Sequence, residues 1–437
     1  MVHSRATIAQ HLCRTAWPIH RVDNTQMDED LKNILIAGGG IGGLAAALAC
    51  SRAGWSVELI ERSPAFGEVG AGIQMGPNVV QVLHGWGLAQ ALKQVAAFPE
   101  VLQVRSANSG AALGRLPLGE RTRARYGAPY ATIHRADLHR MLLAAVVQQG
   151  STALHVGQQL LSYLDTGSAV QVHTVQGLQL QGGALVGADG LWSSVRQQML
   201  GPNDGAPRVT GHLAYRAMVR QADLPAALRS QEIMVWLGPK LHVVQYPVRG
   251  GDWLNVVAIV QGAVPEGRDV QDWDHATHTR DLQATMGKTC GALQALIAAI
   301  QTWRLWALCD RPPMAGAQQQ AQGQVALLGD AAHPMRPYMA QGAGMAIEDA
   351  ACLQSVLAQR EVPMAKRLAA YAQQRWQRNA RVQARSIRNG QIFHATGVVR
   401  WGRDLSMRLL GERLLDVPWL YQGPTTGADQ RPQKVQT

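Results

Sequence analysis

The chain has little cysteine and no obvious metal-binding pattern. Its 437 residues include only five cysteines, and no two of them form a CxxC pair. The odd number and the missing pairs argue against a disulfide framework and against a zinc module, and they favour a reducing compartment such as the cytoplasm. His275 and His278 form an isolated HxxH without a third ligand at useful spacing. We therefore expect no metal ion.

Acidic residues are also scarce, so the chain carries a net charge of +11. Between Arg360 and Arg413, 12 basic residues stand against only three acidic ones. A basic surface suits an anionic partner, which could be a nucleic acid, a membrane or a small acid. Few aromatic residues lie among these arginines and no nucleic-acid motif accompanies them. We interpret the segment as a solvated, Arg-rich helical face and expect no nucleic-acid partner.

Long apolar runs that could span a membrane are missing as well. Residues 33–51 carry no charge, but five of them are glycines within six positions. A spanning helix would lose stability there, so the segment is better interpreted as strand, turn and helix, and we expect no stable membrane insertion. Residues 1–26 lack a hydrophobic signal core; a transit peptide is one reading, and Met27 resembles an alternative start. We expect residues 1–30 to be a disordered extension.

The same glycines form a Gly38-x-Gly40-x-x-Gly43 pattern. By itself this pattern is weak, because 45 glycines in one chain match it by chance. Its context is stronger: an aliphatic run precedes it, an Ala/Leu helix follows, and a second strand ends at Glu61. The first glycine permits a tight turn, the second a close approach to a pyrophosphate, and the third close helix–strand packing. Glu61 can accept from a ribose hydroxyl. The motif alone does not separate FAD from NAD.

A second candidate phosphate site follows much later. Residues 325–330 have the form of a buried strand that ends in Gly-Asp, and Pro334 and Pro337 prevent a helix from starting at once. A glycine-rich helix is predicted to start near Gly342. Its N-terminus would offer unpaired N–H groups to an anion or a polarised carbonyl. NAD needs no second binding site so far along the chain, whereas the flavin half of FAD could extend to the start of this second helix.

A third strand end lies between these two. An apolar strand stops at Asp189-Gly190, after which Ser193 or Ser194 can cap a short helix. An ordinary Asp-Gly turn would look the same. Three such strand ends in one chain are better explained by one extended ligand that contacts all three than by three unrelated turns.

The region 207–311 has a different sequence pattern, in which apolar runs are separated by turns and not by helices. Two turns separate the apolar runs EIMVWL, KLHVVQYPV and WLNVVAIV, which are typical of antiparallel hairpins. Residues 282–300 are predicted to form one helix. With 437 residues and 47% hydrophobic composition, the chain can build two domains.

GGGIGG, VGADGLWSSVR and LLGDAAHPMRPYMAQGAGMAIEDA resemble the three flavin-site motifs of single-component FAD-dependent aromatic hydroxylases. Within this family, EVGAGIQMGPN, IHRADLH, VTGHLAYRAMV, YPVRGG and FHATGVVRWGRD are most similar to 3-hydroxybenzoate 6-hydroxylases, with salicylate hydroxylases and 6-hydroxynicotinate monooxygenases close by. The resemblance implies an α/β fold. A Rossmann-like FAD-binding domain (31–205 and 321–365) would be interleaved with an antiparallel-sheet substrate domain (206–320), followed by C-terminal helices (366–437).

The resemblance also implies which residues hold FAD. Arg135 would reach the diphosphate, Asp189 would line the groove where pyrophosphate and nicotinamide meet, and Asp330 would bind the ribityl-phosphate region. The full predicted cofactor set is Gly38, Gly40, Gly43, Glu61, Arg62, Arg135, Asp189, Asp330, Gly342, Gly344 and Met345.

The best catalytic candidate is His212, in GHLAYRAMV. A phenol titrates near ~10 and a histidine near ~6.5, so a neutral histidine within hydrogen-bond reach can take the phenol proton as the ring is attacked. A structural role is the alternative for any one of 14 histidines. Tyr215, Gln245 and Gln301 are the candidate substrate-binding residues. Gln245 stands where the nearest relatives are expected to have histidine.

The implied activity is an NADH- or NADPH-dependent monooxygenase that acts on a small hydroxylated aromatic acid and O2. The best candidate reaction converts 3-hydroxybenzoate to 2,5-dihydroxybenzoate (gentisate). Salicylate hydroxylase and 6-hydroxynicotinate 3-monooxygenase activities are the alternatives within the family. A flavin-dependent dehydrogenase that inserts no oxygen is the alternative outside it. The choice of nicotinamide and a homodimeric state stay open.

Overall fold

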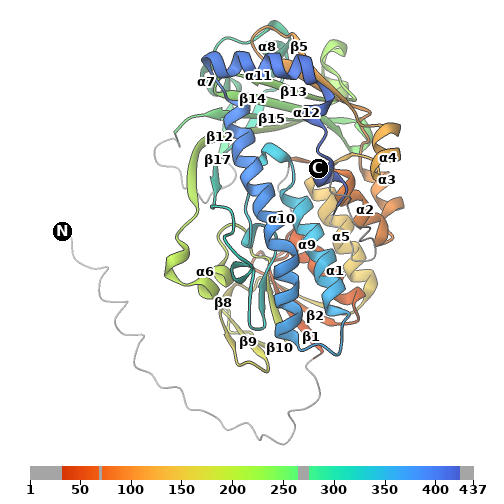
Figure 1. The fold of residues 1–437 in the computed structure, drawn as a ribbon, viewed down its shortest axis with the longest axis vertical. Coiled ribbons are helices and arrows are strands. Elements are labelled where there is room, and N and C mark those ends of the chain that lie inside the picture. Colours follow the sequence, from red (N-terminus) through yellow and green to blue (C-terminus); the bar gives the residue numbers. More distant parts are fainter. Residues whose placement is uncertain (1–31, 68–70, 264–274, 424–437) are drawn as a thin grey trace, which may run out of the picture. The chain divides into compact units, whose positions relative to one another are not determined.

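The computed structural model describes residues 32–67, 71–263 and 275–423. The predicted extension at residues 1–30 therefore lies outside the described residues, as does the end of the predicted C-terminal region. Within the described part, the mixed α/β architecture predicted from the sequence is confirmed (Figure 1).

One sheet has six strands, and four of its five pairings are parallel. Parallel strands need crossover connections. The helix Ile41–Arg52 connects the first strand of the chain to the second, and the helix Arg135–Gln149 directly precedes the strand Thr152–Val156. The pattern of aliphatic strand, glycine turn and Ala/Leu helix at residues 33–61 predicts the first of these connections. In spatial order the strands are β18 (Ala321–Gln322), β19 (Val325–Leu327), β11 (Ala184–Gly187), β1 (Asn33–Ala37), β2 (Ser56–Glu61) and β7 (Thr152–Val156).

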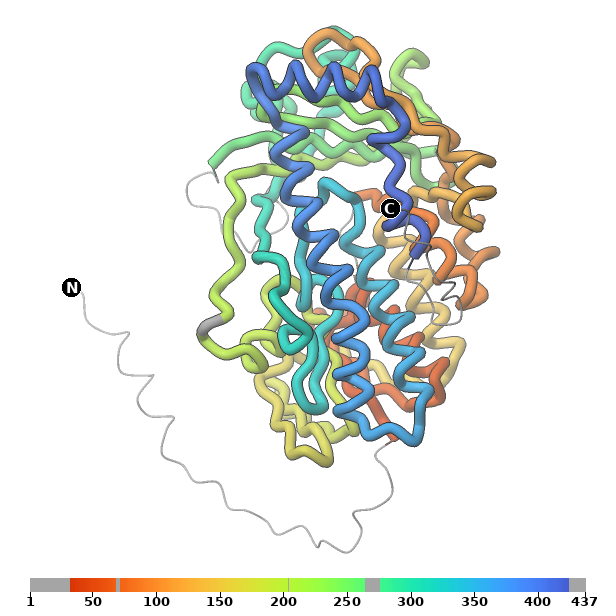
Figure 2. The backbone as a smooth tube through the Cα atoms, in the orientation of Figure 1, coloured from red at the N-terminus to blue at the C-terminus, as the bar shows by residue number. Residues whose placement is uncertain are grey.

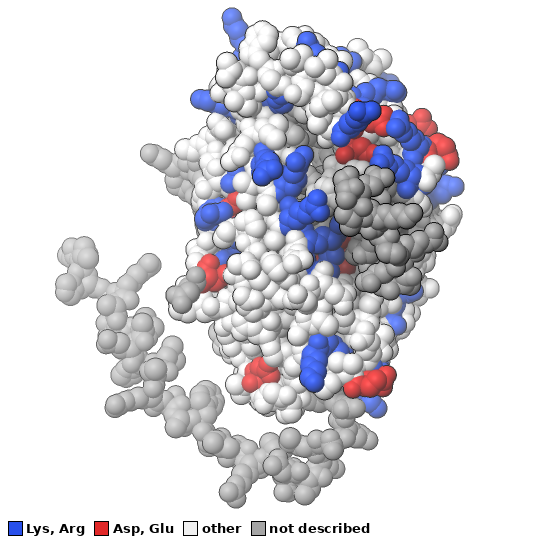
Figure 3. Space-filling view, viewed as in Figure 1, with Lys and Arg blue, Asp and Glu red and all other residues white. Residues whose placement is uncertain are grey.

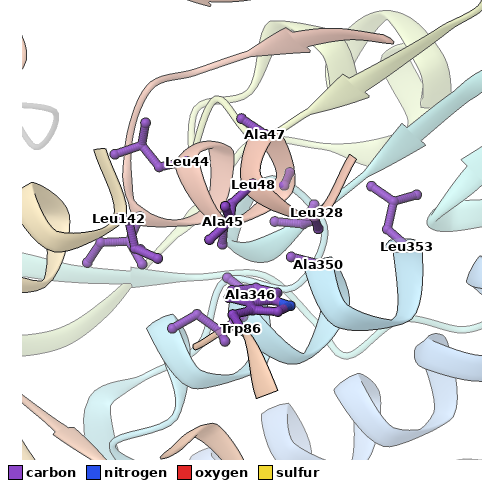
Figure 4. Close-up of a cluster of buried hydrophobic side chains, with 14 of the residues drawn as sticks. Leu44, Ala45, Ala47, Leu48, Trp86, Leu142, Leu328, Ala346, Ala350 and Leu353 are labelled. Carbon is purple, nitrogen blue, oxygen red and sulfur yellow. The ribbon is translucent and has the colours of Figure 1, made fainter. Parts of the chain in front are cut away.

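Segments from both ends of the described chain pack together beside this sheet. Helix α1 (Ile41–Arg52) contacts α5 (Arg135–Gln149) and α9 (Gly342–Leu357), and α9 contacts the long helix α10 (Met364–Phe393) (Figure 2). Small residues allow the close approach: Figure 4 shows alanines and leucines of α1 in one buried cluster with Ala346 and Ala350. Each buried leucine contributes about 1.5–3 kcal/mol.

The other large sheet has eight strands and is antiparallel except between β13 and β4. The hairpins predicted between residues 232 and 260 are present. Strands β4 and β5 also join this sheet, although they fall inside the range 31–205 that was predicted to belong to the FAD-binding domain. In spatial order the strands are β16 (His275–His278), β17 (Thr302–Asp310), β12 (Arg208–Arg220), β15 (Trp253–Gln261), β14 (Leu241–Val248), β13 (Ile233–Gly238), β4 (Val101–Ser106) and β5 (Ala112–Pro117).

The single helix predicted over residues 282–300 is wrong. Two helices, α7 (Thr279–Met286) and α8 (Gly291–Ala298), occupy the region, and Gly287 between them has φ +65°. A left-handed residue ends a right-handed helix, and glycine adopts that conformation without steric cost. Both helices pack on one face of the eight-stranded sheet, which we call the α7–α8 face.

C-terminal helices follow α10, as predicted, beginning with α11 (Gly397–Leu410). Within the described residues, no helix combines the length and the apolar content needed to cross a membrane. The remaining elements are α2 (Pro77–Gly85), α3 (Ala89–Val95), α4 (Glu120–Tyr126), α6 (Ser194–Leu200), α12 (Glu412–Leu415), α13 (Pro418–Tyr421), β3 (Gly72–Met75), β6 (Ala131–His134), β8 (Leu160–Asp165), β9 (Val170–Thr174) and β10 (Gln179–Gly182).

Candidate active site

A cleft with a cavity of about 370 Å³ opens at the carboxyl ends of β1, β2, β11 and β19. This edge is where open α/β sheets bind ligands. The three predicted motifs all line it, although about 290 residues separate Gly38 from Asp330. Most of the predicted cofactor residues are therefore brought together: Gly38, Gly40, Glu61, Arg62, Arg135, Asp189, Asp330 and Gly342.

The glycines at the start of α1 are fixed by backbone contacts. Gly38 has φ +105°, and a Cβ atom added there would lie 2.4 Å from the carbonyl oxygen of Ala188. A Cβ atom added to Gly43 would lie 1.7 Å from the carbonyl oxygen of Gly38. No side chain fits at either distance. The tight turn and the close helix–strand packing expected from the motif are both present.

Glu61 lies at the end of β2 and holds the glycine loop. Its carboxylate accepts from the backbone N–H of Gly39 at 2.6 Å and of Ser63 at 2.8 Å. The side chain of Arg62 is exposed at the edge of the cleft. Glu61 is thus positioned before any ligand binds, which is what recognition of a ribose hydroxyl requires.

Asp189 lines the cleft, but much of its hydrogen-bonding capacity serves helix α6. Its carboxylate accepts from the hydroxyls of Ser193 and Ser194 at 2.5 and 3.1 Å, and from the N–H of Ser194 and Val195 at 2.8 and 3.2 Å. Burial raises the pKa of Asp189, and these bonds oppose the shift. Of the two predicted candidates, Ser193 is the residue that caps α6, by accepting from the N–H of Arg196 at 2.9 Å.

Asp330 and Gly342 are neighbours in the lining of the cleft. The Asp330 side chain is exposed to the cleft. Loss of hydration in the surrounding protein raises the pKa of its carboxyl group, and the positive charges of His333 and Arg135 act in the opposite direction. A Cβ atom added to Gly342 would find its nearest neighbour in Asp330 Oδ1, at 3.9 Å. The start of α9 therefore presents its backbone to a free volume, as the second phosphate site requires.

Two predicted cofactor residues have other surroundings. A Cβ atom added to Gly344 would lie 2.7 Å from Val79 Cγ2, so this glycine permits packing of α9 against α2. Met345 is fully buried and packs with Val382 and Leu420. The structure does not place either side-chain position on the cleft. The flavin contact expected of these two residues stays a prediction.

A buried ionic network that the sequence reasoning missed supports the turn at residues 329–333. Asp349 on α9 accepts from the N–H of Gly329 at 3.2 Å, from His333 Nε2 at 2.5 Å and from Arg375 Nε on α10 at 2.7 Å. Burial raises the pKa of Asp349, but His333 and Arg375 outweigh it and hold that pKa well below its usual range. Arg375 also pairs with Glu348 at 3.0 Å.

This network corrects the prediction of a solvated, Arg-rich helical face in part, because three of the basic residues between Arg360 and Arg413 are buried. Arg375 is 1% exposed, and Arg367 and Arg403 are also buried. Other basic residues do reach the surface: Figure 3 shows them spread over this side, with acidic residues in a few small groups. The signal that could have revealed the network was the pair Glu348-Asp349 inside an otherwise apolar helix, because paired carboxylates there need buried cations.

His212 lies on β12, on the face of the eight-stranded sheet opposite α7 and α8, which we call the His212 face. Its Nδ1–H donates to the carbonyl oxygen of Thr210 at 3.0 Å, which leaves Nε2 as the acceptor. Burial and the nearby Arg336 lower the pKa of His212. The imidazole is therefore neutral at pH 7 and able to accept a proton.

Side chains around His212 come from distant parts of the chain and were not predicted. The ring of His394, at the end of α10, lies 4.9 Å from that of His212 between centroids, and Tyr338 lies at 6.1 Å. His394 Nε2 and His242 Nδ1 share a hydrogen bond of 2.8 Å. Tyr338 belongs to the loop that joins Asp330 to Gly342, so the His212 face contacts the segment that forms the cleft.

The three predicted substrate residues do not join His212. Tyr215 is 4% exposed and packs on the α7–α8 face, because residues an odd number apart in a strand point to opposite sides. Gln245 lies on that face too and accepts from Trp236 Nε1 at 3.3 Å. Gln301 is exposed just before β17. The structure therefore places none of the three beside His212, and their role in substrate binding stays a prediction.

Comparison with known proteins agrees with the geometry. The FAD binding domain family matches residues 32–386. The 3-hydroxybenzoate 6-hydroxylase of Polaromonas naphthalenivorans (strain CJ2) is 40% identical over 390 residues, which is 89% of this chain and 95% of that protein. The 6-hydroxynicotinate 3-monooxygenase of Bordetella bronchiseptica (strain ATCC BAA-588 / NCTC 13252 / RB50) is 34% identical over 75% of this chain and 82% of that protein.

Among solved structures, a salicylate hydroxylase–substrate complex superimposes with a TM-score of 0.75 at 26% identity, covering 90% of this chain and 95% of that one. The fold and the cleft define an FAD-dependent aromatic-ring monooxygenase. The chain belongs to the FAD binding domain family and, within it, to the FAD-dependent aromatic hydroxylases.

The cleft fits FAD on its own chemistry. Glycine backbone at the starts of α1 and α9 offers two N–H clusters to phosphate or carbonyl oxygens, and Arg135 in the lining of the same cleft supplies positive charge. Glu61 is in place for the ribose. Within the described residues, no three histidine, cysteine, aspartate or glutamate side chains come together in a way that could hold a metal ion.

Proposed function

We propose that this enzyme hydroxylates 3-hydroxybenzoate to 2,5-dihydroxybenzoate with NADH or NADPH as reductant. One oxygen atom of O2 enters the ring, the other leaves as water, and the nicotinamide supplies two electrons. The observation that carries the substrate assignment is the 40% identity to a 3-hydroxybenzoate 6-hydroxylase over 95% of that protein. The neutral histidine on the sheet face next to the cleft supports the reaction type.

FAD would be held by the glycine loop, Glu61, Arg135 and Asp330, and by the start of α9. When bound, it supplies the redox chemistry that links nicotinamide oxidation to oxygen transfer. The protein has the remaining tasks, which are to orient the ring, exclude water and move a proton.

His212 performs the proton transfer. Attack on the carbon para to the hydroxyl needs electron density there, and a phenolate supplies more of it than a phenol. With its Nδ1–H fixed on Thr210, His212 presents the Nε2 lone pair and accepts the phenol proton as attack begins. The low pKa keeps that lone pair available at neutral pH.

Product analysis tests the proposal. Purified enzyme would be incubated separately with 3-hydroxybenzoate, salicylate and 6-hydroxynicotinate, and products and nicotinamide oxidation would be measured for each. We expect 2,5-dihydroxybenzoate from the first at a near-stoichiometric ratio to nicotinamide oxidised, and only slow, uncoupled oxidation with the others. Catechol and CO2 from salicylate, without 2,5-dihydroxybenzoate from 3-hydroxybenzoate, would refute the substrate assignment and leave the enzyme class intact.

A further inference from the structure

The glycine loop between β1 and α1 is held by a side chain that lies 100 residues later in the chain. His139 on α5 is 4% exposed, and its Nε2 atom lies 2.8 Å from the carbonyl oxygen of Gly39. Because a carbonyl oxygen only accepts, Nε2 carries the hydrogen and donates it. The imidazole stands beside the ring of Phe66, with 6.0 Å between the centroids. A buried histidine of α5 therefore reaches directly into the phosphate-binding loop.

Helix α1 does not use the Gly39 carbonyl in its own hydrogen bonds. Its first backbone bond runs from the N–H of Leu44 to the carbonyl oxygen of Gly40, the N-cap residue. The Gly39 carbonyl lies one residue earlier, and Gly39 is buried. Among the described residues, His139 is the one donor that reaches this oxygen. Without the imidazole, a buried carbonyl would stay unpaired, which is costly.

Two further side chains fix the same glycine. The N–H of Gly39 donates to Glu61 at 2.6 Å. A Cβ atom added to Gly39 would lie 2.6 Å from Cε1 of Phe66, so the space beside its α-carbon is filled. Gly39 is thus bonded at both of its polar groups and enclosed at its α-carbon. This leaves the peptide group between Gly39 and Gly40 one orientation.

The orientation of this peptide group decides where the N–H of Gly40 points. A trans peptide is planar, and its C=O and N–H point in opposite directions. With the Gly39 oxygen held toward α5, the Gly40 N–H points away from His139. Gly40 lines the cleft, and within residues 32–67, 71–263 and 275–423 its N–H has no acceptor. The donor is therefore free for a ligand in the cleft.

His139 and Arg135 lie one turn apart on α5, and both line the cleft. Arg135 can act on a phosphate by its own charge. The Nε2–H of His139 is already used inside the protein, so this residue acts through the loop. We propose that His139 is a positioning residue for the FAD pyrophosphate: by holding the Gly39 carbonyl, it presents the Gly40 N–H to a phosphate oxygen. The inference concerns the cofactor and does not depend on the identity of the aromatic substrate.

The test measures the nucleotide affinity of the full-length apoprotein. Dissociation constants of FAD would be measured by flavin fluorescence, and those of ADP and adenosine by competition with FAD. His139→Leu removes the donor, and His139→Gln restores an N–H at the position of Nε2. Trp55→Phe is the matched control, because Trp55 Nε1 donates to the carbonyl oxygen of Leu357 at 3.1 Å and neither residue lines the cleft. Denaturant unfolding of each apoprotein would be recorded alongside.

We expect His139→Leu to bind FAD and ADP about 10- to 100-fold more weakly, since hydrogen bonds to charged groups are the stronger ones. Adenosine carries no phosphate, so its affinity should not change. His139→Gln should recover most of the loss. Trp55→Phe should unfold more easily than wild type and keep the wild-type affinity for all three nucleotides, which is the behaviour of a residue with a structural role alone.

Lower stability of His139→Leu with wild-type affinity for FAD and ADP would overturn the proposal. An equal loss for ADP and adenosine would also overturn it, because the effect would then lie at the adenosine end of the site. The same holds if His139→Gln binds FAD no better than His139→Leu. If His139→Leu does not fold, His139→Asn replaces it, because its amide is too short to reach the Gly39 oxygen, and the comparison with His139→Gln decides.

Discussion

The cofactor cleft and the His212 face are built on different physical principles. Backbone atoms form most of the cleft: glycines at strand ends, helix N-termini and one carboxylate that braces the loop. The His212 face is built from side chains on separate segments, which include β12, β14, β17, the loop that carries Tyr338 and the end of α10. A backbone site is encoded by short local motifs, whereas a side-chain site depends on which strand lies beside which, and on which face each residue falls.

The largest expected effect is at Gly43. Its added Cβ would lie 1.7 Å from a backbone oxygen, so Gly43→Ala should abolish FAD binding and prevent normal folding. Gly402→Ala on α11 is the matched control, because Gly402 is exposed, lies outside the cleft and has no atom within 4 Å of its added Cβ. FAD absorbance and circular dichroism of both variants would be compared. Normal FAD content in Gly43→Ala would show that the cleft is not fixed by backbone packing.

On the His212 face, the largest effect is expected from His212→Ala. The variant should keep FAD and still oxidise nicotinamide when substrate is added, but hydroxylation should fall by about 10²–10⁴ and peroxide should appear instead. Because the pKa of His212 is lowered, the acid limb of kcat/KM should lie below pH ~6.5 in the wild type and disappear in the variant. Unchanged coupling of nicotinamide oxidation to product would remove His212 from its catalytic role.

Asp349→Ala tests the buried network that joins the two late helices to the cleft. Its removal leaves Arg375 with one carboxylate fewer, and such a change costs about 3–5 kcal/mol of unfolding free energy. Its depressed pKa means that Asp349 stabilises the fold above the unfolded value of ~3.9, and that this contribution is lost as pH falls further. Denaturant unfolding at pH 7 and at pH 3.5 measures both effects. A melting curve equal to wild type would contradict the interpretation.

Asp330→Ala should weaken FAD retention more modestly. If its carboxylate accepts from the cofactor, a buried donor is left unpaired at a cost of about 1–3 kcal/mol, or roughly 10- to 100-fold in FAD affinity. Fluorescence titration of the apoprotein with FAD gives the affinity directly. Asp165→Ala, a carboxylate outside the cleft that holds the strand end at Gln324, separates a general loss of stability from a loss of cofactor contact.

The smallest expected effect is at Tyr215. Because its side chain packs on the α7–α8 face, Tyr215→Phe should change the KM for the aromatic acid by no more than about twofold. A Tyr215→Phe variant with a tenfold higher KM, unchanged FAD content and unchanged stability would reverse the assignment of faces.

Features built from backbone conformation could be predicted from the sequence, whereas those built from side chains of distant segments could not. The Gly38 turn, the helix start at Gly342 and a serine cap at Ser193 or Ser194 were predicted correctly, because each depends on the conformation of a few neighbouring residues. His212 came from a motif resemblance, and its role stays a prediction. Tyr215 and Gln245 were predicted to bind the substrate, and that role stays a prediction. The alternation of side chains along β12 and β14 places them on the opposite face.

By itself the sequence determined the local geometry: strands that end in glycine or Gly-Asp, helices that start with small residues, and hence the phosphate-binding ends of one long cofactor. Only the tertiary structure decided that Asp349 and Arg375 would meet in the interior, that His394 would approach His212, and that His139 would donate to Gly39. The physical reason is the distance along the chain between the residues that interact. Backbone conformation follows from neighbours within a few residues, whereas charge compensation and face assignment depend on contacts between segments that the chain order does not reveal.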